Sequence, residues 1–202
     1  MKLQTTKRLP EKERRRSILD AALSVLSSEG YSGMTTARVA RRVGVAEPIL
    51  YRHFSSKRDI LRTLLDEVSA RMLTEFRGMT EGETDPVKAL HRICRAYPEL
   101  SRRFSREFRV INQSVFEAGD PETRELLERH YEAYRAFIEE LIKGGQRAGA
   151  LRRDISAAAG AWHMIHCALG MLMMQEVRKD GYSSRELAAL AEATLSGLLI
   201  TT

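Results

Sequence analysis

Apolar residues recur every three or four positions along most of this chain, which is the period of an amphipathic helix. No stretch of any length alternates apolar and polar residues as a β-strand does. The chain is therefore predicted to be all-α, with about nine helices. We expect them at residues 11–28, 36–43, 46–54 and 56–78, as two helices within 86–115 divided at Pro98, and at 121–144, 155–179 and 184–200.

Residues 35–57, TTARVARRVGVAEPILYRHFSSK, are predicted to form two short helices joined by a tight turn. Thr35 is the expected N-cap of the first helix, and Gly44 supplies the left-handed residue at the turn. Pro48 falls in the first turn of the second helix, where a missing N–H costs nothing. Leu50 and Phe54 anchor that second helix in the core. This is the layout of a helix-turn-helix whose second helix enters the major groove of DNA.

The segment GVAEPILYRHFSSK resembles the recognition segment of the tetracycline-repressor (TetR) family of one-component transcriptional regulators. Tyr51, Phe54, Ser56 and Lys57 match the family pattern LYxxFxSK. The resemblance implies an N-terminal three-helix helix-turn-helix DNA-binding domain and a C-terminal helical ligand-binding and dimerisation domain. It also implies a homodimer that acts most often as a repressor, released from a palindromic operator when a small molecule binds.

Charge supports a division of the chain into two functional parts. Residues 1–62 hold 14 Lys/Arg against 6 Asp/Glu, a net of +8, whereas the rest of the chain holds 19 against 21, a net of −2. A basic end that carries a helix-turn-helix is expected to meet a polyanion. We predict a loose basic arm at 1–10, the DNA-binding domain at 11–55, a connecting helix at 56–78 and the ligand-binding and dimerisation domain at 79–202.

The resemblance also implies roles for individual residues on the DNA-facing side. Phosphate contacts are expected from Thr36, Tyr51, His53 and Lys57. Base readout is expected from Arg38, Glu47, Pro48 and Arg52, because arginine grips guanine with two donors and a carboxylate accepts from cytosine. Thr35 and Ala46, which precede the two helices, are also expected to belong to the DNA-binding surface. Many members carry Ser or Thr, then a basic residue and Gly, where this chain has Ala46, Glu47 and Pro48, so the individual base contacts depart from the common pattern.

An effector pocket between helices of the C-terminal domain is a further implication of the resemblance. Its candidate lining residues are polar or aromatic side chains on helical stretches, namely His91, Cys94, Tyr97, Phe108, Asn112, Tyr134, Trp162, His163 and His166. Each of them taken singly fits ordinary core packing as well. An arginine cluster in residues 92–109 is a second candidate feature, either as an anion site or as a solvated face.

The stretch from Ala157 to Met174 has no charged side chain and is predicted to be a helix buried nearly all round. A chain of 202 residues does not easily cover such a helix by itself. The family's dimerisation through the last two helices would supply the cover. The small residues Gly160, Gly170, Ala188 and Ala191 would permit close approach.

Other chemistries are not favoured by the sequence. His91/Cys94 and His163/His166/Cys167 have spacings that place two metal ligands on one helix face, but no further ligand lies nearby, so neither a metal site nor a cofactor is predicted. A Gly-rich phosphate loop and a nucleophile elbow are absent, so we do not expect an enzyme. The rival hypothesis is a helical enzyme or carrier with a basic N-terminal unit.

The expected location of the protein is the cytoplasm. The N-terminus has no apolar signal region, and no apolar run is expected to approach the ~20 residues that span a bilayer. Cys94 and Cys167 are predicted to be reduced core residues. The expected partners are therefore double-stranded DNA, a small-molecule effector and a second copy of the chain, with no membrane.

Overall fold

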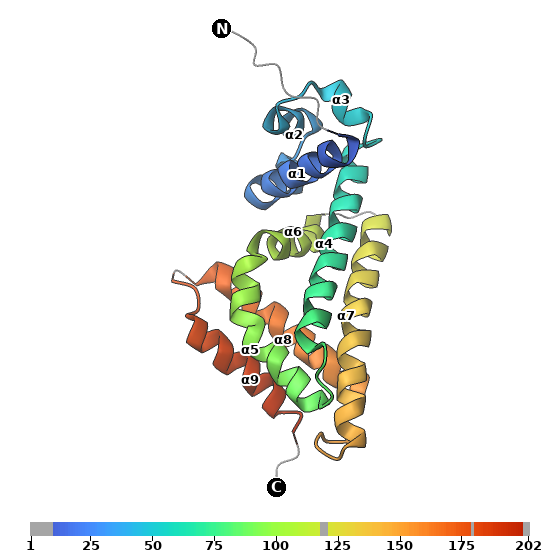
Figure 1. Cartoon of the computed structure of the whole chain (residues 1–202). Coiled ribbons are helices and arrows are strands. Elements are labelled where there is room, and N and C mark those ends of the chain that lie inside the picture. The colour runs from blue at the N-terminus through green and yellow to red at the C-terminus, as the bar shows by residue number, and fades with distance from the viewer. Residues whose placement is uncertain (1–9, 118–120, 179, 200–202) are drawn as a thin grey trace. The chain divides into compact units, whose positions relative to one another are not determined.

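The computed structural model describes residues 10–117, 121–178 and 180–199, so the expected basic arm lies outside the described residues except for Pro10. The described residues form nine helices and, in place of any strand, a single bridge between Leu151 and Leu199 (Figure 1). The predicted all-α class is confirmed. The helices are α1 (Glu11–Gly33), α2 (Thr36–Val43), α3 (Glu47–Tyr51), α4 (Lys57–Thr80), α5 (Pro86–Arg103), α6 (Ser105–Glu117), α7 (Pro121–Arg147), α8 (Ala157–Val177) and α9 (Ser184–Ser196).

These helices form two compact units. Unit 1 comprises the described residues up to Val68 together with Arg106–Leu127, and unit 2 comprises Ser69–Ser105 with the described residues from Glu128 onward. In unit 1, α6 is tied to α1 because Arg109 Nη1 donates to the Ser27 carbonyl at 3.3 Å. The compact units therefore group α6 with the first helices, whereas the boundaries predicted from the sequence place it in the C-terminal domain. Those functional boundaries remain a prediction.

Local capping signals set several helix ends as predicted. The Thr35 side chain accepts from the Arg38 N–H at 3.2 Å, and Gly44 adopts a left-handed conformation with φ of 76°. Ser183 and Glu186 form the expected reciprocal capping box at α9. At α4 the Ser56 hydroxyl accepts from the Asp59 N–H at 3.1 Å, but the Asp59 carboxylate turns to Ser55 instead of completing the box.

Two predicted helix ends were wrong. Pro98 does not divide the chain there, since α5 runs through it to Arg103 and the break falls at Phe104. Tyr97 and Leu100, on either side of the proline, are both buried, and α5 packs along α9, so side-chain packing compensates for the backbone hydrogen bond that proline cannot make. The recognition helix α3 ends at Tyr51 rather than Phe54, although the Phe54 N–H still bonds the Leu50 carbonyl at 3.0 Å.

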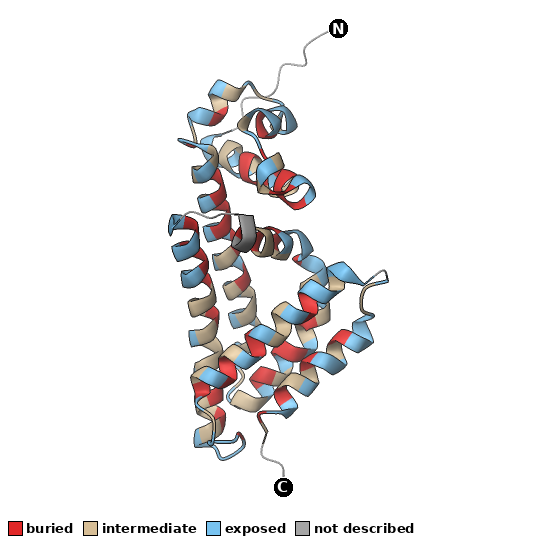
Figure 2. Ribbon diagram, turned by 180° about the vertical axis from the view of Figure 1, so that it is seen from behind, coloured by how far each residue is buried: buried red, intermediate tan, exposed pale blue. Residues whose placement is uncertain are grey.

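The single chain does not by itself bury α8 nearly all round. Met173, Met174 and Val177 are 53%, 44% and 73% exposed, and no described helix is coloured as buried along its whole surface (Figure 2). The exposed Gly170 has open space around it. Gly160 instead serves packing inside the chain, since an added Cβ would lie 3.1 Å from Ile142 Cδ1. One face of α8 is thus exposed in the single chain.

The apolar character of α8 corrects a further expectation. This helix has 21 residues, and an 18-residue window of it reaches a mean hydropathy of 1.3 with 39% of the window buried, so by length and composition it could cross a membrane. The statement that no apolar run approaches that length is therefore wrong. A core helix of a globular protein has the same length and composition, so this feature by itself does not indicate a membrane span.

Candidate nucleic-acid interface

The recognition helix is held in place by an apolar core within unit 1. Leu50 and Phe54 are buried, as are Ile18 on α1 and Val39 on α2. Arg15, on α1, lies over the Phe54 ring with 4.4 Å from its guanidinium carbon to the ring centroid, and Arg15 Nη1 donates to the His53 carbonyl at 3.3 Å. This arginine was not among the residues predicted to have a role. It fixes the end of the helix-turn-helix to the first helix.

Thr36, Glu47 and Tyr51 meet between the two helices of the motif. The Thr36 hydroxyl donates to the Glu47 carboxylate in a short hydrogen bond, and the Thr36 and Tyr51 hydroxyl oxygens are 3.3 Å apart. Glu47 also stands in the first turn of α3, where a negative charge complements the helix dipole. The carboxylate predicted to read a base is thus occupied in joining α2 to α3.

Two of the predicted basic contacts are directed at the protein itself. Arg38 forms an ion pair with Glu29, and its Nη1 donates to the Gly33 carbonyl at 2.8 Å, at the end of α1. Lys57 donates to the Tyr31 carbonyl at 2.6 Å, and its ammonium lies 3.9 Å from the Tyr31 ring centroid. Either side chain would have to give up these contacts to reach DNA.

The remaining candidates form the open surface of the motif. Ala46, Pro48 and Arg52 are exposed, Tyr51 is 51% exposed and His53 is partly buried. The Arg52 side chain makes no hydrogen bond or ion pair with any residue that the structure describes, although the Arg52 backbone N–H bonds the Ile49 carbonyl at 3.3 Å. Its guanidinium is therefore available to a base edge, whereas Tyr51 is available to a phosphate through its hydroxyl.

The start of the connecting helix α4 is stabilised by a carboxylate. Partial burial acts to raise the pKa of Asp59, but the Ser55 N–H and hydroxyl, together with the charge of Arg62, hold that pKa below its ordinary value. The carboxylate therefore stays ionised while it caps the turn that follows the recognition helix. This cap ties Ser55, at the end of the recognition segment, to α4.

The nine effector candidates are divided between the two units. Phe108 and Asn112 belong to unit 1, and the other seven belong to unit 2. In unit 2, His91 contacts Glu192 with 2.7 Å between Nδ1 and Oε2, and Tyr97 donates its hydroxyl to the Ala168 carbonyl at 2.8 Å. Burial raises the pKa of the Cys94 thiol to about 12, with the nearby Glu192 charge adding to the effect, so this thiol stays protonated. Cys94 and Tyr97 are thus core residues, whereas His91 is partly exposed.

Three further candidates lie on α8. Trp162 is partly buried, and its ring stacks on that of the exposed His166 with 5.4 Å between the centroids. His163 is exposed and lies 3.9 Å from the Cys167 sulfur. Within the described residues no group of three or more His, Cys, Asp or Glu side chains could hold a metal ion. His163 and His166 therefore lie on the surface of unit 2, and Trp162 is partly buried.

Tyr134 is the candidate with the most unusual surroundings, and sequence reasoning missed its neighbours. His130, one turn before it on α7, is buried, with 4.5 Å between the two ring centroids. Tyr131 and Phe76 also contact this pair. The available signal was a histidine four residues before a tyrosine in an apolar stripe, which does not by itself separate a site from packing.

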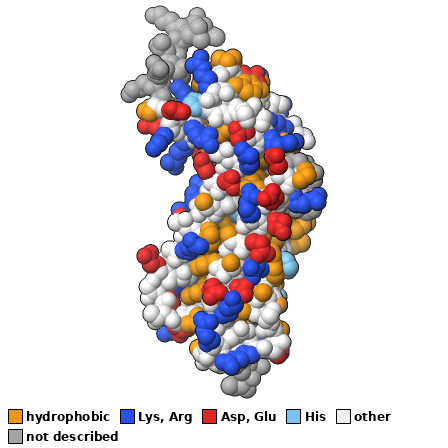
Figure 3. All heavy atoms as spheres, turned by 90° about the vertical axis from the view of Figure 1, so that its right-hand side faces the viewer, with side chains coloured by type: hydrophobic (Ala, Val, Ile, Leu, Met, Phe, Trp, Pro, Cys, Tyr) orange, Lys and Arg blue, Asp and Glu red, His pale blue; other side chains and the backbone are white. Residues whose placement is uncertain are grey.

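The arginines of residues 92–109 do not converge on one point. Four of them form ion pairs with acidic residues, namely Arg92 with Glu83, Arg95 with Glu192, Arg102 with Glu99 and Arg103 with Glu75. Basic and acidic side chains are likewise interspersed on the face shown in Figure 3, with hydrophobic side chains visible between them. The pairing is that of a solvated face, and it does not support an anion site.

Comparison with known proteins agrees with the motif. Residues 18–64 match the sequence profile of the "Bacterial regulatory proteins, tetR family". The nucleoid occlusion factor SlmA of Haemophilus influenzae is 34% identical over 93 residues, which are 46% of this chain and 43% of that protein. The transcriptional activator FasR of Mycolicibacterium smegmatis is 32% identical over 109 residues, 54% of this chain and 50% of that protein. The chain thus spans about half the length of these relatives.

The fold extends over nearly the whole chain. A putative transcriptional regulator from Saccharomonospora viridis, solved in complex with choline, superposes with a TM-score of 0.83 at 22% identity, covering 95% of this chain and all of that one. Such a likeness establishes the arrangement of helices and leaves the ligand open.

Proposed function

By its residues 18–64 the chain belongs to the tetR family of bacterial regulatory proteins, and from this premise we propose that it is a sequence-specific, DNA-binding transcriptional regulator. It acts in the cytoplasm as a homodimer on a palindromic operator, with half-sites about one helical turn apart or more. As a repressor it is released when a small molecule binds the predicted C-terminal domain. It carries out no enzymatic reaction.

The observation that carries this proposal is the exposed surface of the helix-turn-helix. Tyr51, at the end of the recognition helix, and Arg52, directly after it, are exposed, while the buried Leu50 and Phe54 anchor this segment in the core. We assign base reading to Arg52 and a phosphate contact to Tyr51. Glu47 is assigned a supporting role in place of base readout, because its carboxylate holds the Thr36 hydroxyl beside Tyr51.

The first prediction concerns DNA selection. Purified protein is expected to enrich a palindromic consensus from random duplex DNA at near-physiological salt. Arg52→Ala is expected to lower affinity for that consensus by roughly 5- to 150-fold and to relax preference at particular base pairs, because one bidentate base contact contributes about 1–3 kcal/mol. Arg77→Ala, which removes an exposed arginine from the unit 2 part of α4, is the control and should change neither affinity nor preference. An unchanged consensus in Arg52→Ala would remove this residue as a reader.

A second candidate function comes from the relatives named nucleoid occlusion factors. A DNA-bound factor of that kind need not change transcription. A reporter placed behind the selected consensus separates the two functions: repression or activation of the reporter supports the regulator. Binding without any change in transcription supports the second candidate. Specific ligand binding without any enriched DNA would support the helical enzyme or carrier instead.

The second prediction concerns the dimer, which we propose to form through α8 and α9. The exposed apolar residues Met173, Met174 and Val177 on α8 are of the kind that a partner covers. Met174→Arg places like charges in both copies of this isologous surface, which costs several kcal/mol, so the dimer dissociation constant should rise at least about 100-fold. Sedimentation velocity would measure it. Ala136→Arg, at an exposed position of α7, should leave the dimer intact.

A further inference from the structure

Two polar side chains in the interior of unit 2 have no hydrogen-bond partner. His130 and Tyr134 lie one turn apart on α7 and are only 6% and 8% exposed. Neither His130 Nδ1 nor the Tyr134 hydroxyl has a partner among the described residues. Tyr97, also 8% exposed, shows the usual arrangement, since its hydroxyl donates to the Ala168 carbonyl at 2.8 Å. Burying a polar group without a partner costs free energy, so two adjacent ones indicate a site that has another use.

Each member of this pair contacts a further aromatic ring. The Phe76 ring, on α4, meets Tyr134 edge-on with 5.4 Å between centroids, and Tyr131 meets His130 at 5.0 Å. The His130 and Tyr134 rings are themselves nearly perpendicular, at 86°. Edge-to-face arrangements of this kind favour a further aromatic ring over an aliphatic chain, because the ring edge and face carry opposite partial charges.

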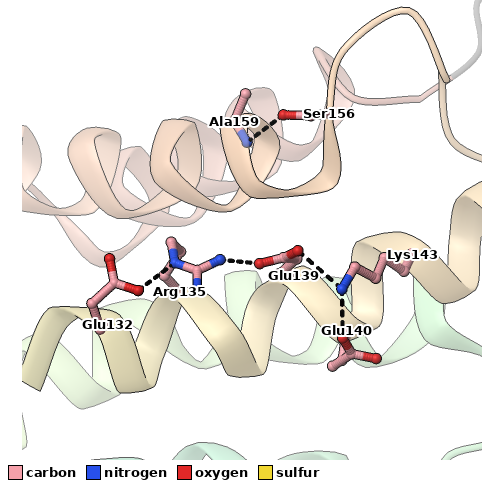
Figure 4. A network of polar contacts seen from close by, with 7 residues as sticks. All are labelled: Glu132, Arg135, Glu139, Glu140, Lys143, Ser156 and Ala159. Atoms are coloured by element: carbon pink, nitrogen blue, oxygen red, sulfur yellow. Dashed lines mark hydrogen bonds and ion pairs between the residues drawn. The ribbon is translucent and has the colours of Figure 1, made fainter. Parts of the chain in front are cut away.

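The charged side chains of residues 132–143 on α7 are engaged with one another. Arg135 donates to Glu132 at 2.6 Å and pairs with Glu139, and Lys143 lies 3.0 Å from Glu139 and 2.9 Å from Glu140 (Figure 4). The hydrogen bond from Lys143, and then the charges of Lys143 and Arg135, hold the pKa of Glu139 below its ordinary value although partial desolvation opposes them. The charges of Arg135 and Lys143 are therefore balanced by acidic side chains of the same helix.

His130 and Tyr134 themselves are neutral at physiological pH. Burial lowers the pKa of His130 to about 4 and raises the pKa of Tyr134 well above its ordinary value, with the neighbouring Tyr131 adding to the second effect. A neutral imidazole nitrogen accepts or donates one hydrogen bond according to its tautomer, and a phenol does both. A charged ligand at this place would have to be buried against uncharged groups, which is costly.

We propose that His130 and Tyr134 are the polar anchor of an effector site in unit 2, and that its ligand is an uncharged aromatic molecule bearing a hydroxyl or carbonyl oxygen. The ligand oxygen accepts from the Tyr134 hydroxyl and pairs with His130 Nδ1, and the ligand ring packs among Phe76 and Tyr131. This inference rests on the proposed function, for which it names the effector class and the residues that recognise it.

The place of Phe76 links this site to the DNA-binding helices through the chain itself. Phe76 is on α4, and the same helix begins at Lys57, directly after the recognition segment. In the proposed site the ligand ring packs against Phe76, whose ring already lies edge-on to Tyr134. Movement of Phe76 would act on the helix that Asp59 caps at its other end.

The test uses the full-length protein and three small probes of matched size. They are 4-hydroxyacetophenone as the uncharged aromatic, benzoate as an anion and choline as a cation, with binding measured by calorimetry. The uncharged probe is expected to bind in preference to the other two. Tyr134→Phe and His130→Phe should each weaken it at least about tenfold, because each leaves a ligand hydrogen bond unmade in a buried site. Tyr182→Phe, which removes a hydroxyl outside the cluster, should bind as the wild type does.

Each other outcome overturns the inference. No binding of 4-hydroxyacetophenone at millimolar concentration, preference for benzoate or choline, or equal binding by Tyr134→Phe and His130→Phe would each contradict the anchor or the ligand class. The DNA selection experiment stays independent of this result. A palindromic consensus without binding of the uncharged probe rejects the inference and keeps the regulator. Probe binding that Tyr134→Phe weakens, without any specific DNA, rejects the regulator and keeps the site.

Discussion

Phe54→Ala is expected to lower the free energy of unfolding by about 3–5 kcal/mol, which is a large part of the stability of an ordinary domain. The Phe54 side chain is 1% exposed, so its removal leaves a cavity beneath the recognition helix. It also removes the ring on which the Arg15 guanidinium lies at 4.4 Å. Denaturant unfolding followed by circular dichroism, at fixed protein concentration, would measure the loss. DNA binding should weaken in parallel, because Tyr51 and Arg52 depend on this anchor for their position.

Two variants separate the packing effect from the loss of DNA contacts. Phe54→Leu keeps most of the buried volume and should cost less than about 1.5 kcal/mol. Tyr51→Phe removes only an exposed hydroxyl, so stability should stay within about 0.5 kcal/mol of the wild type while DNA affinity falls. If Phe54→Ala unfolded at the same denaturant concentration as Tyr51→Phe, Phe54 could not be the anchor of this helix.

Signals confined to a few neighbouring residues were sufficient for much of the fold. Thr35, Gly44 and the Ser183/Glu186 pair set helix ends through bonds to residues within one turn, so the sequence alone locates them. The apolar anchors Leu50 and Phe54 also follow from helical spacing. The continuation of α5 through Pro98 could not be predicted in this way. The packing of α5 on α9 compensates for the hydrogen bond that proline lacks, and that packing joins parts of the chain far apart in sequence.

The hydrogen-bond and ion-pair partners of the DNA-facing side chains could not be predicted from the sequence for the same reason. Arg38 pairs with Glu29, Thr36 with Glu47 and Lys57 with Tyr31, across 9, 11 and 26 residues. Helical periodicity assigns a residue to a face, but it does not say which polar group on a neighbouring helix comes within hydrogen-bond distance. Composition likewise marked α8 as apolar without showing whether its own chain or a second copy covers it.

The buried pair on α7 leads to the second large effect, a loss of stability in acid that depends on His130. Burial lowers the pKa of His130 to about 4, below the value of 6.5 that it has in the unfolded chain. Between these two values the unfolded state binds the proton and the folded state does not, so stability falls as pH decreases from about 6.5 towards 4. The pKa difference of His130 alone should lower the free energy of unfolding by about 2.5 kcal/mol by pH 4.5.

His130→Phe is expected to remove that part of the pH dependence. At pH 7 the variant should be at least as stable as the wild type. The substitution replaces an imidazole, whose buried Nδ1 has no hydrogen-bond partner, by an apolar aromatic ring. On acidification the stability advantage of His130→Phe over the wild type should grow to about 2.5 kcal/mol at pH 4.5.

Tyr134→Phe is the matched control, since it deletes the other unpartnered polar atom and keeps the imidazole, and it should lose stability in acid as the wild type does. Parallel curves for His130→Phe and the wild type, measured by denaturant unfolding from pH 7 to 4.5, would mean that His130 accepts a proton in the folded state. The anchor would then carry charge and would favour an anionic ligand over the uncharged aromatic one.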